Sequence, residues 1–356
     1  MSSSDALMLS VSGCRGTIGG SLTPEVAQRF AAAFAGWLKA NKRGGKPVAV
    51  ALGRDGRRGS DLFAGVARAA LLAEGCDVVD LDIAMTPTVG VMVDRLGLDG
   101  GLVVTASHNP QNWCGLKPIV RRPGARAGVV DASAPGRVVA DELIARFGEQ
   151  SPPQVRDWRS LGHACVEREL GNRHQFAVRA ALGASAAGKL ARFAPTIVVD
   201  NLGMSGAVMS DWALRTLAPK SRVRQAYEST ADLRRSADRG VFPHTPEPTR
   251  ENLAGLCRLV KKHRANVGFA QDPDADRLAI IDEQGRYIGE EYTLVLAAMA
   301  LGELGQLPRR SVIAVNLSTS RMIEDVAARY GCRVVRTAVG EANVVSAMKA
   351  HRSPLG

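Results

Sequence analysis

The sequence predicts an α/β fold made of several similar mixed α/β three-layer domains in series. The first observation is that short apolar strand candidates alternate with loops and amphipathic helices along the chain. The second is that residues 48–82 and 311–338 share one layout, in which a strand, a small-residue loop and a helix lead to Gly-Cys-x-Val-Val. The third is length, because 356 residues are too many for one ordinary core and indicate two or three domains.

The first expected helix has Thr23 as its N-cap and Pro24 in its first turn. The residues expected on its buried face are Val26, Phe30, Phe34 and Trp37. Residues 48–52 are a strand candidate, and Ser60 should cap the helix that follows the loop "GRDGRRGS". The apolar face expected for that second helix comprises Leu62, Val66, Ala69 and Ala70.

Later strands are expected at residues 196–199 and 312–316. The loop at 242–253 should lead into a helix with Thr249 as its cap. The whole chain is therefore expected to form three domains, at residues 1–150, 151–287 and 288–356. The polar, proline-containing stretch "SPPQVRDW" would link the first two domains, and "IGEE" would precede the first helix of the third.

Charge and apolar run lengths argue against two classes of partner. The net charge is +11, but the basic residues form no long block, and aromatic residues, 4% of the chain, are not interleaved with them as in proteins that stack bases. Nucleic acid is therefore not expected as a partner. The longest apolar stretches, residues 30–38 and 293–302, are too short to span a bilayer, so no membrane partner is expected.

The N-terminus and the cysteines indicate a cytoplasmic protein. The first ten residues lack the basic segment and the hydrophobic stretch of a secretory signal. The six cysteines include no C-x-x-C pair, so neither a zinc site nor a disulfide framework is expected. Reduced cysteines are the ordinary state in the cytoplasm.

Ser107 stands at the end of an apolar strand candidate, in the stretch "GLVVTASHNP" at residues 101–110. The dipeptide Asn109-Pro110 accounts for a turn, but it does not account for a serine between Ala106 and His108. A serine hydrolase would need G-x-S-x-G at a strand–helix elbow, which is absent here. The adjacent His108 is not expected to turn its ring onto the Ser107 hydroxyl, so acyl transfer is not expected.

A second stretch, "QDPDADRLAIID" at residues 271–282, places Asp272, Asp274 and Asp276 in alternation before an apolar strand. One interpretation is a solvated surface turn. A calcium loop is a poor match, because its sixth position would be Arg277 instead of glycine and a strand follows. The third interpretation is a Mg²⁺ site, because oxygen ligands at alternate positions of a tight loop suit a hard divalent ion. A phosphoryl group on Ser107 would then supply a further oxygen ligand.

Six stretches resemble the α-D-phosphohexomutases, the family of phosphoglucomutase, phosphomannomutase and phosphoglucosamine mutase. They are "SGCRG" (12–16), "TASHNP" (105–110), "GLK" (115–117), "DPDADR" (272–277), "NLSTSRMIEDVA" (316–327) and "TAVGEANVV" (337–345). They cover nearly the whole chain in the order expected of the family. The resemblance implies an intramolecular phosphotransferase that moves a phosphoryl group between the 1- and 6-positions of a hexose phosphate, through a phosphoserine and a bisphosphate intermediate.

The resemblance also implies a cofactor and a modified residue. Ser107 would be the phosphorylated nucleophile and phosphoryl donor. The metal ligands would be Asp272, Asp274 and Asp276, which would bind Mg²⁺ together with the phosphate on Ser107. The implied partners are hexose phosphate and hexose 1,6-bisphosphate, and the protein would be a monomer or a homodimer.

Four further residues receive roles from the same resemblance. Arg15 would stabilise charge on the phosphoryl group, and Lys117 would be the leading general acid/base. Arg277 would lie beside the active site and bind substrate, and His108 would orient the serine loop. Glucosamine phosphate is the first expectation for the sugar, followed by mannose or glucose phosphate.

The chain departs from the family pattern at two places. Cys114 stands where the family has asparagine before Gly-(Ile/Leu)-Lys. The family continues beyond the point where this chain ends, at Gly356, so the third domain is expected to be truncated and a fourth to be missing. A second hypothesis follows, in which the protein binds phosphosugars with Mg²⁺ but has no mutase activity.

Overall fold

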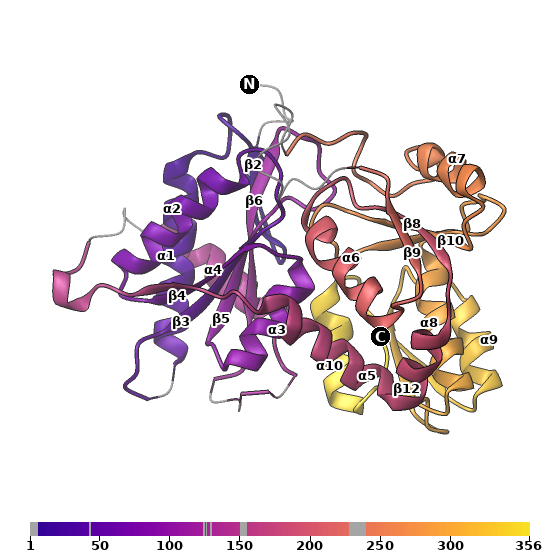
Figure 1. Ribbon diagram of the computed structural model, residues 1–356. Coiled ribbons are helices and arrows are strands. Elements are labelled where there is room, and N and C mark those ends of the chain that lie inside the picture. Colours follow the sequence, from indigo (N-terminus) through magenta and orange to yellow (C-terminus); the bar gives the residue numbers. More distant parts are fainter. Residues whose placement is uncertain are drawn as a thin grey trace.

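The computed structural model describes residues 6–42, 44–123, 125, 127–128, 130–149, 155–227 and 240–356. Within these residues the strands form sheets of seven, four and two strands. Figure 1 shows the corresponding strand–helix regions, coloured from indigo at the N-terminus to yellow at the C-terminus. The prediction of mixed α/β units in series is confirmed.

The first sheet has the strand order β1-β2-β6-β5-β3-β4-β7. Its strands are β1 (Met8–Ser10), β2 (Gly13–Thr17), β3 (Ala49–Arg54), β4 (Asp77–Ile83), β5 (Gly100–Val104), β6 (Trp113–Val120) and β7 (Ala164–Val166). The strands β5, β3, β4 and β7 are parallel, whereas β6, β2 and β1 are added through antiparallel pairs. The carboxyl ends of β3 and β5 therefore meet at one edge, where functional loops of parallel sheets commonly lie.

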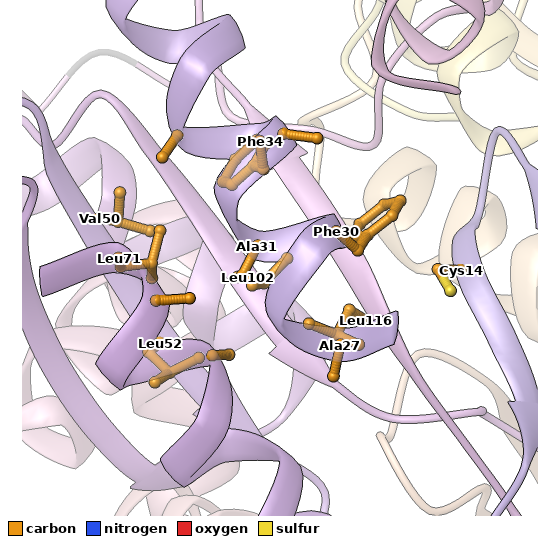
Figure 2. Packing of buried hydrophobic residues seen from close by; sticks show 14 of the residues in the cluster. Cys14, Ala27, Phe30, Ala31, Phe34, Val50, Leu52, Leu71, Leu102 and Leu116 are labelled. Atoms are coloured by element: carbon orange, nitrogen blue, oxygen red, sulfur yellow. The ribbon is translucent and has the colours of Figure 1, made fainter. Parts of the chain in front are cut away.

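Helices cover both faces of this sheet and complete three layers. They are α1 (Pro24–Asn41), α2 (Ser60–Ala73), α3 (Thr86–Leu96) and α4 (Arg137–Glu149). Phe30 and Phe34 of α1 pack with Leu102 of β5 in the main core (Figure 2). Helices α2 and α4 also contribute residues to this core. Val89 and Met92 of α3 belong to a separate cluster on the opposite face.

The first helix agrees with its prediction more closely than the second. The hydroxyl of Thr23 accepts a hydrogen bond from the Val26 amide, and Phe30, Phe34 and Trp37 are buried, although Val26 is only half-buried. The prediction for α2 was wrong in two respects. Gly59 occupies the N-cap position and Ser60 is the first helical residue, with no side-chain cap.

The buried face of α2 also differs from the predicted one. The buried apolar residues are Phe63, Ala67, Ala70 and Leu71, whereas Leu62 is 52% exposed. Both sets have helical spacing, so the periodicity alone did not decide between Leu62 and its neighbour Phe63. The contact with α1 decided it, because burying the larger Phe63 ring removes more apolar surface from water.

The second sheet has the order β11-β10-β8-β9. Its strands are β8 (Thr196–Asp200), β9 (Arg222–Gln225), β10 (Val267–Gln271) and β11 (Leu278–Ile281), and its helices are α5 (Leu170–Arg192), α6 (Ser205–Leu217) and α7 (Ala254–His263). The strand predicted at residues 196–199 is thus confirmed. Strands β10 and β11 form an antiparallel hairpin, and the acidic loop at residues 272–276 lies between them.

Thr249 does not cap α7, contrary to the prediction. The helix begins at Ala254, and its N-cap position is Leu253. Residues 250–253 form a turn first, in which the Thr249 hydroxyl accepts only a long hydrogen bond of 3.5 Å from the Asn252 amide. The intervening turn moves the start of the helix beyond the reach of the Thr249 side chain.

The third unit contains the parallel pair β12 (Val312–Asn316) and β13 (Arg333–Thr337) with α8 (Glu291–Glu303), α9 (Met322–Arg329) and α10 (Glu341–His351). The internal similarity seen in the sequence has a structural cause. Gly75 and Gly331 follow α2 and α9 with φ angles of 74° and 69°, and the next residue, Cys76 or Cys332, donates its amide back to the helix. Glycine ends both helices because it adopts left-handed φ without a Cβ clash.

The domain limits 1–150, 151–287 and 288–356 remain a proposal. Strand β7 pairs with β4, so the first sheet includes residues beyond 150. Residues 151–154 of the predicted linker lie outside the described residues. Among the helices of the described part of the chain, none combines the length and apolar character needed to cross a bilayer.

Candidate active site

Ser107 lies in the tight turn that follows β5. Its φ angle is 49°, in the left-handed region, and the residue is only 4% exposed. Its amide donates to the Thr105 hydroxyl at 2.8 Å. A non-glycine residue in this conformation costs about 1–2 kcal/mol, so the surrounding contacts must hold it there.

The acidic loop approaches Ser107 from the second sheet. The Ser107 hydroxyl donates to Asp272 Oδ2 at 2.8 Å, across 165 residues of sequence. Asp272, Asp274 and Asp276 each offer a carboxylate oxygen, and these oxygens all lie within 4.8 Å of one another. The structure therefore brings together the two stretches that were singled out in the sequence.

The acidic loop has the features of a site for a divalent cation. Asp272 and Asp274 are fully buried, and Oδ1 of Asp274 has no hydrogen-bond donor among the described residues. Burial, with Asp274 and Asp276 nearby, raises the pKa of Asp272 well above its usual value. A hard cation bound by oxygen ligands would relieve both the orphaned oxygen and the mutual repulsion, so this donor set fits Mg²⁺.

A residue of the first domain, Thr86, also holds the acidic loop through hydrogen bonds. Thr86, the first residue of α3, donates its hydroxyl to Asp274 Oδ2 at 2.5 Å, and its amide donates to the Asp274 carbonyl at 2.9 Å. Thr86 was not identified from the sequence. Its only signal was its position at the start of a helix, before a proline.

Lys117 of β6 provides a buried positive charge opposite the acidic loop. Its Nζ lies 2.8 Å from Asp276 Oδ2 and 3.6 Å from Glu341 Oε2 of the third unit. Burial alone would lower the pKa of Lys117, but Asp276, Asp274 and Glu341 together raise it above its usual value. Lys117 therefore holds its proton in this state.

Gly115 allows β2 to approach, because a Cβ there would lie 2.3 Å from the Cys14 carbonyl oxygen.

Arg15 lies on β2, opposite Gly115 of β6. Its guanidinium donates to Asn109 Oδ1 at 3.3 Å, and its Nε has no hydrogen-bond partner among the described residues. Burial lowers the pKa of Arg15, and the charges of Asp274 and Asp276 act against that change. A half-buried guanidinium whose buried Nε–H has no acceptor can bind an anionic group such as a phosphate.

His108 differs from its prediction. Its Nδ1 lies 3.2 Å from the Ser107 hydroxyl, so the expectation that the ring would not reach this hydroxyl was wrong. The left-handed backbone of Ser107 changes the relative direction of the two side chains. Burial, reinforced by the charge of Arg277, lowers the pKa of His108, which keeps its ring neutral at pH 7.

The Arg277 amide donates to Asp272 Oδ1 at 3.2 Å, and its guanidinium lies 3.9 Å from Glu247. The side chain is 35% exposed and forms part of the wall of a cavity of about 580 Å³. The same wall includes Ser107 and Lys117 from the first domain. A cationic side chain in this position can bind the anionic part of a ligand.

The third unit closes another side of the cavity with residues 338–343. Glu341, the first residue of α10, carries a negative charge in this wall; it lies within the stretch "TAVGEANVV", but the family resemblance gave it no role. Cys114, the departure from the family pattern, is fully buried in β6, and burial raises the pKa of its thiol to about 12. The thiol is therefore protonated and unreactive.

Three successive parts of the chain match domains of known proteins. Residues 7–128, 188–285 and 289–356 match the α/β/α domains I, II and III of phosphoglucomutase/phosphomannomutase. The phosphoglucomutase/phosphomannomutase of Thermococcus kodakarensis is 32% identical over 346 residues, which are 97% of this chain and 69% of that protein. A probable phosphoglucosamine mutase of Methanopyrus kandleri is 32% identical over 340 residues, 95% of this chain and 67% of that protein. The expected truncation of the third domain stays a prediction.

Solved structures share the fold. A phosphoglucomutase/phosphomannomutase family protein from Burkholderia thailandensis has a TM-score of 0.75 at 22% identity, covering 98% of this chain and 70% of that one. A putative phosphomannomutase from Thermus thermophilus has a TM-score of 0.75 at 23% identity, covering 95% and 70%. Because the three domains match in order and the relatives reach 32% identity, the chain belongs to the α-D-phosphohexomutases, a family of isomerase-class phosphomutases.

Proposed function

We propose that the protein moves a phosphoryl group between the 1- and 6-positions of a hexose phosphate, with phosphorylated Ser107 as donor and a hexose bisphosphate as intermediate. The observation that carries the proposal is the hydrogen bond of 2.8 Å between the Ser107 hydroxyl and Asp272, at a cavity also lined by Arg15 and Lys117. A nucleophile, cationic groups and a carboxylate cluster thus meet at one cavity. Phosphoryl transfer depends mainly on such positioning and charge stabilisation.

Asp272, Asp274 and Asp276 would hold Mg²⁺, with an oxygen of the Ser107 phosphate as a further ligand. When bound, the cation would neutralise negative charge on the phosphoryl oxygens. Arg15 would contribute positive charge from the first domain through its unused Nε donor. Together these charges would stabilise the phosphoryl group in place of bulk water.

Lys117 would exchange the proton of the sugar hydroxyl. In the step that transfers a phosphoryl group from the bisphosphate to Ser107, the bond from phosphorus to Oγ forms and the bond to the sugar oxygen breaks. Lys117, which is protonated at rest, then gives its Nζ proton to that oxygen, while the Ser107 hydroxyl proton passes to Asp272 Oδ2, its hydrogen-bond acceptor at 2.8 Å. In the opposite direction Asp272 returns that proton to Oγ, and the neutral Lys117 amine takes the proton of the sugar hydroxyl. His108 would orient the loop through its contact with the Ser107 hydroxyl.

The partly exposed side chain of Arg277, in the cavity wall, would bind the anionic part of the substrate. We propose glucosamine phosphate as the first candidate substrate and mannose or glucose phosphate next. Several relatives named phosphoglucosamine mutase support this order, together with a relative named phosphoglucomutase/phosphomannomutase.

Replacing Ser107 by alanine tests the proposal. Turnover of glucosamine, mannose and glucose 1-phosphates is measured with Mg²⁺ and catalytic glucose 1,6-bisphosphate for the wild type and for Ser107→Ala. We expect Ser107→Ala to lose at least about 10⁴-fold in turnover, because the phosphoryl carrier is gone. Ser160→Ala, at an exposed serine remote in sequence, is the matched control and should keep wild-type turnover. Substantial activity of Ser107→Ala, or binding of all three sugars without turnover by the wild type, would refute the proposal.

A further inference from the structure

A buried ion pair lies beneath the serine loop and takes no part in the mechanism described so far. Asp55 and Arg57 follow β3, and the side chains of both are 0% exposed. Arg57 Nε donates to Asp55 Oδ2 at 2.7 Å, and the Arg57 amide donates to Asp55 Oδ1 at 3.0 Å. Removing two charges from water carries a large desolvation cost, so this pair calls for a role beyond stability.

The pair holds both backbone polar groups of Ser107. One terminal nitrogen of Arg57 donates to the Ser107 carbonyl oxygen, and the other donates to the Trp113 carbonyl oxygen at 2.9 Å. On the amide side, Ser107 N–H donates to the Thr105 hydroxyl, which in turn donates to Asp55 Oδ2 at 2.7 Å. The carbonyl and the amide of Ser107 are therefore tied, directly or through one hydroxyl, to the same ion pair.

This closed network acts on a residue whose backbone is strained. Ser107 has a φ angle of 49°, and in this conformation its hydroxyl donates to Asp272. Neither Asp55 nor Arg57 is among the described residues that line the cavity of about 580 Å³. The hydrogen bonds of the pair therefore reach the site through the backbone of Ser107, and only the charge of Arg57 acts on a cavity residue, Arg15, from a distance.

A segment from the second domain covers the pair. The Phe242 ring centroid lies 5.1 Å from Arg57 Cζ. The Gly240 carbonyl accepts hydrogen bonds from the Arg58 amide at 2.7 Å and from Gln111 Nε2 at 3.0 Å, and Gln111 Oε1 accepts from the Phe242 amide at 2.6 Å. This cover keeps water from the ion pair, and hydrogen bonds in such a low-dielectric setting are stronger than in water.

We propose that Asp55 and Arg57 are positioning residues that hold Ser107 in its left-handed conformation, so that its hydroxyl stays aimed at the acidic loop. Arginine is required because its planar fork serves Asp55, Trp113 and Ser107 at once, which a single ammonium does not. The expected effect of the pair on turnover rests on the proposed role of Ser107 as phosphoryl carrier. The claim about the conformation of Ser107 stands independently of it.

The test uses two conservative variants and one control. Arg57→Lys keeps the charge but loses the fork, and Thr105→Val keeps the side-chain shape but removes the link from Asp55 to the Ser107 amide. The control is Arg54→Lys, because Arg54 ends the same strand and pairs at 2.6 Å with Asp82, whose side chain is 69% exposed. Circular dichroism is recorded for each protein, and measurements are made at a temperature where all are folded.

Two readouts are compared. Hydrogen exchange of a peptide spanning residues 101–110, followed by mass spectrometry, should be at least about fivefold faster in Arg57→Lys and Thr105→Val than in the wild type and in Arg54→Lys. In turnover with Mg²⁺ and glucose 1,6-bisphosphate, both variants should lose about tenfold or more in kcat, with KM within about twofold of wild type, because the substrate-binding side chains are untouched.

The outcomes separate the two proposals. Unchanged exchange of the serine-loop peptide in folded Arg57→Lys and Thr105→Val overturns the positioning role, whatever the turnover. Faster exchange together with a wild type that turns over no hexose phosphate supports the positioning role and refutes the proposed function. Exchange of the same peptide that is equally fast in Arg54→Lys would show that the pair contributes only general stability, which also overturns the positioning role.

Discussion

The two loops that carry the proposed chemistry differ in construction from the third-domain rim that faces them, residues 338–343. Ser107, Asp272 and Asp274 are buried, and each is hydrogen-bonded to a residue distant in the sequence. The rim is exposed or half-buried, Val339 is 66% exposed, and α10 has no buried residue. Both regions line or support one cavity, but of the two only the loops contribute buried polar side chains.

Because of this difference, we expect the two regions to contribute differently to catalysis. Groups that act on developing charge must be held before the reaction, because reorganising them in the transition state would add to the barrier. Groups at an exposed rim make contacts that water partly replaces. We therefore expect large effects from small changes in the two loops and small effects from changes in the rim.

The largest effect in this comparison is expected for Asp274→Asn. The substitution keeps the size of the side chain but removes a buried charge from the acidic loop, which weakens its hold on a divalent cation. Turnover should fall roughly 10²–10³-fold at a fixed Mg²⁺ concentration, and the Mg²⁺ concentration for half-maximal activity should rise. Both quantities come from one magnesium titration of the mutase rate.

Glu283→Gln is the matched control for Asp274→Asn. Glu283 is exposed, follows β11, and occupies the twelfth position of the calcium-loop pattern considered for this stretch. We expect its titration curve to coincide with that of the wild type. An unchanged curve for Asp274→Asn would remove the acidic loop from the active site.

A smaller effect is expected for Glu341→Gln in the rim. The Glu341 side chain is 50% exposed, and its oxygen lies 3.6 Å from Lys117 Nζ. An ion pair with one partner this exposed contributes about 0.2–1 kcal/mol, which corresponds to a change in kcat/KM of about 1.4-fold to fivefold. If Glu341→Gln reduced kcat/KM as much as Asp274→Asn, the division between fixed loops and adjustable rim would be wrong.

The smallest effect is expected at His244, two residues beyond Phe242 of the segment that covers the Asp55–Arg57 pair. His244 Nε2 lies 2.9 Å from Asp200 Oδ2. Burial alone would lower the pKa of His244, but the hydrogen bond and the charge of Asp200 raise it above its usual value. A raised pKa in the folded state means that this stabilisation is complete below about pH 6.5 and is lost as the pH rises through the folded value.

The stability difference between wild type and His244→Gln should therefore shrink as the pH increases from about 6 to about 8.5. Urea unfolding midpoints at the two pH values measure this difference. A gap of constant size would mean that the proton on His244 does not couple to folding.

Local signals predicted the parts of the molecule that are determined locally. Thr23 and Pro24 marked the start of α1, and the apolar runs at 196–199 and 312–316 are strands, because capping chemistry and strand patterning act over a few residues. The exposed position of Leu62 and the late start of α7 were missed. Neighbouring elements and an intervening turn determine these features.

The same limit applies to the site. Ser107 and the three aspartates stood out because their residue types and spacing have no good structural explanation. Thr86 and Arg57 did not stand out, because their importance lies in partners 188 and 50 residues away. The approach of the His108 ring to the Ser107 hydroxyl depends on a left-handed turn that no residue type in "TASHNP" announces.

The most direct test of the central claim is to locate the phosphoryl group on the protein. The full chain is incubated with Mg²⁺ and glucose 1,6-bisphosphate, digested, and analysed by tandem mass spectrometry. The account predicts phosphate on Ser107 in the wild type and none at any serine or threonine of the same peptide in Ser107→Ala. Phosphate at another residue, or turnover of a hexose phosphate by a protein that carries no phosphate at Ser107, would contradict it.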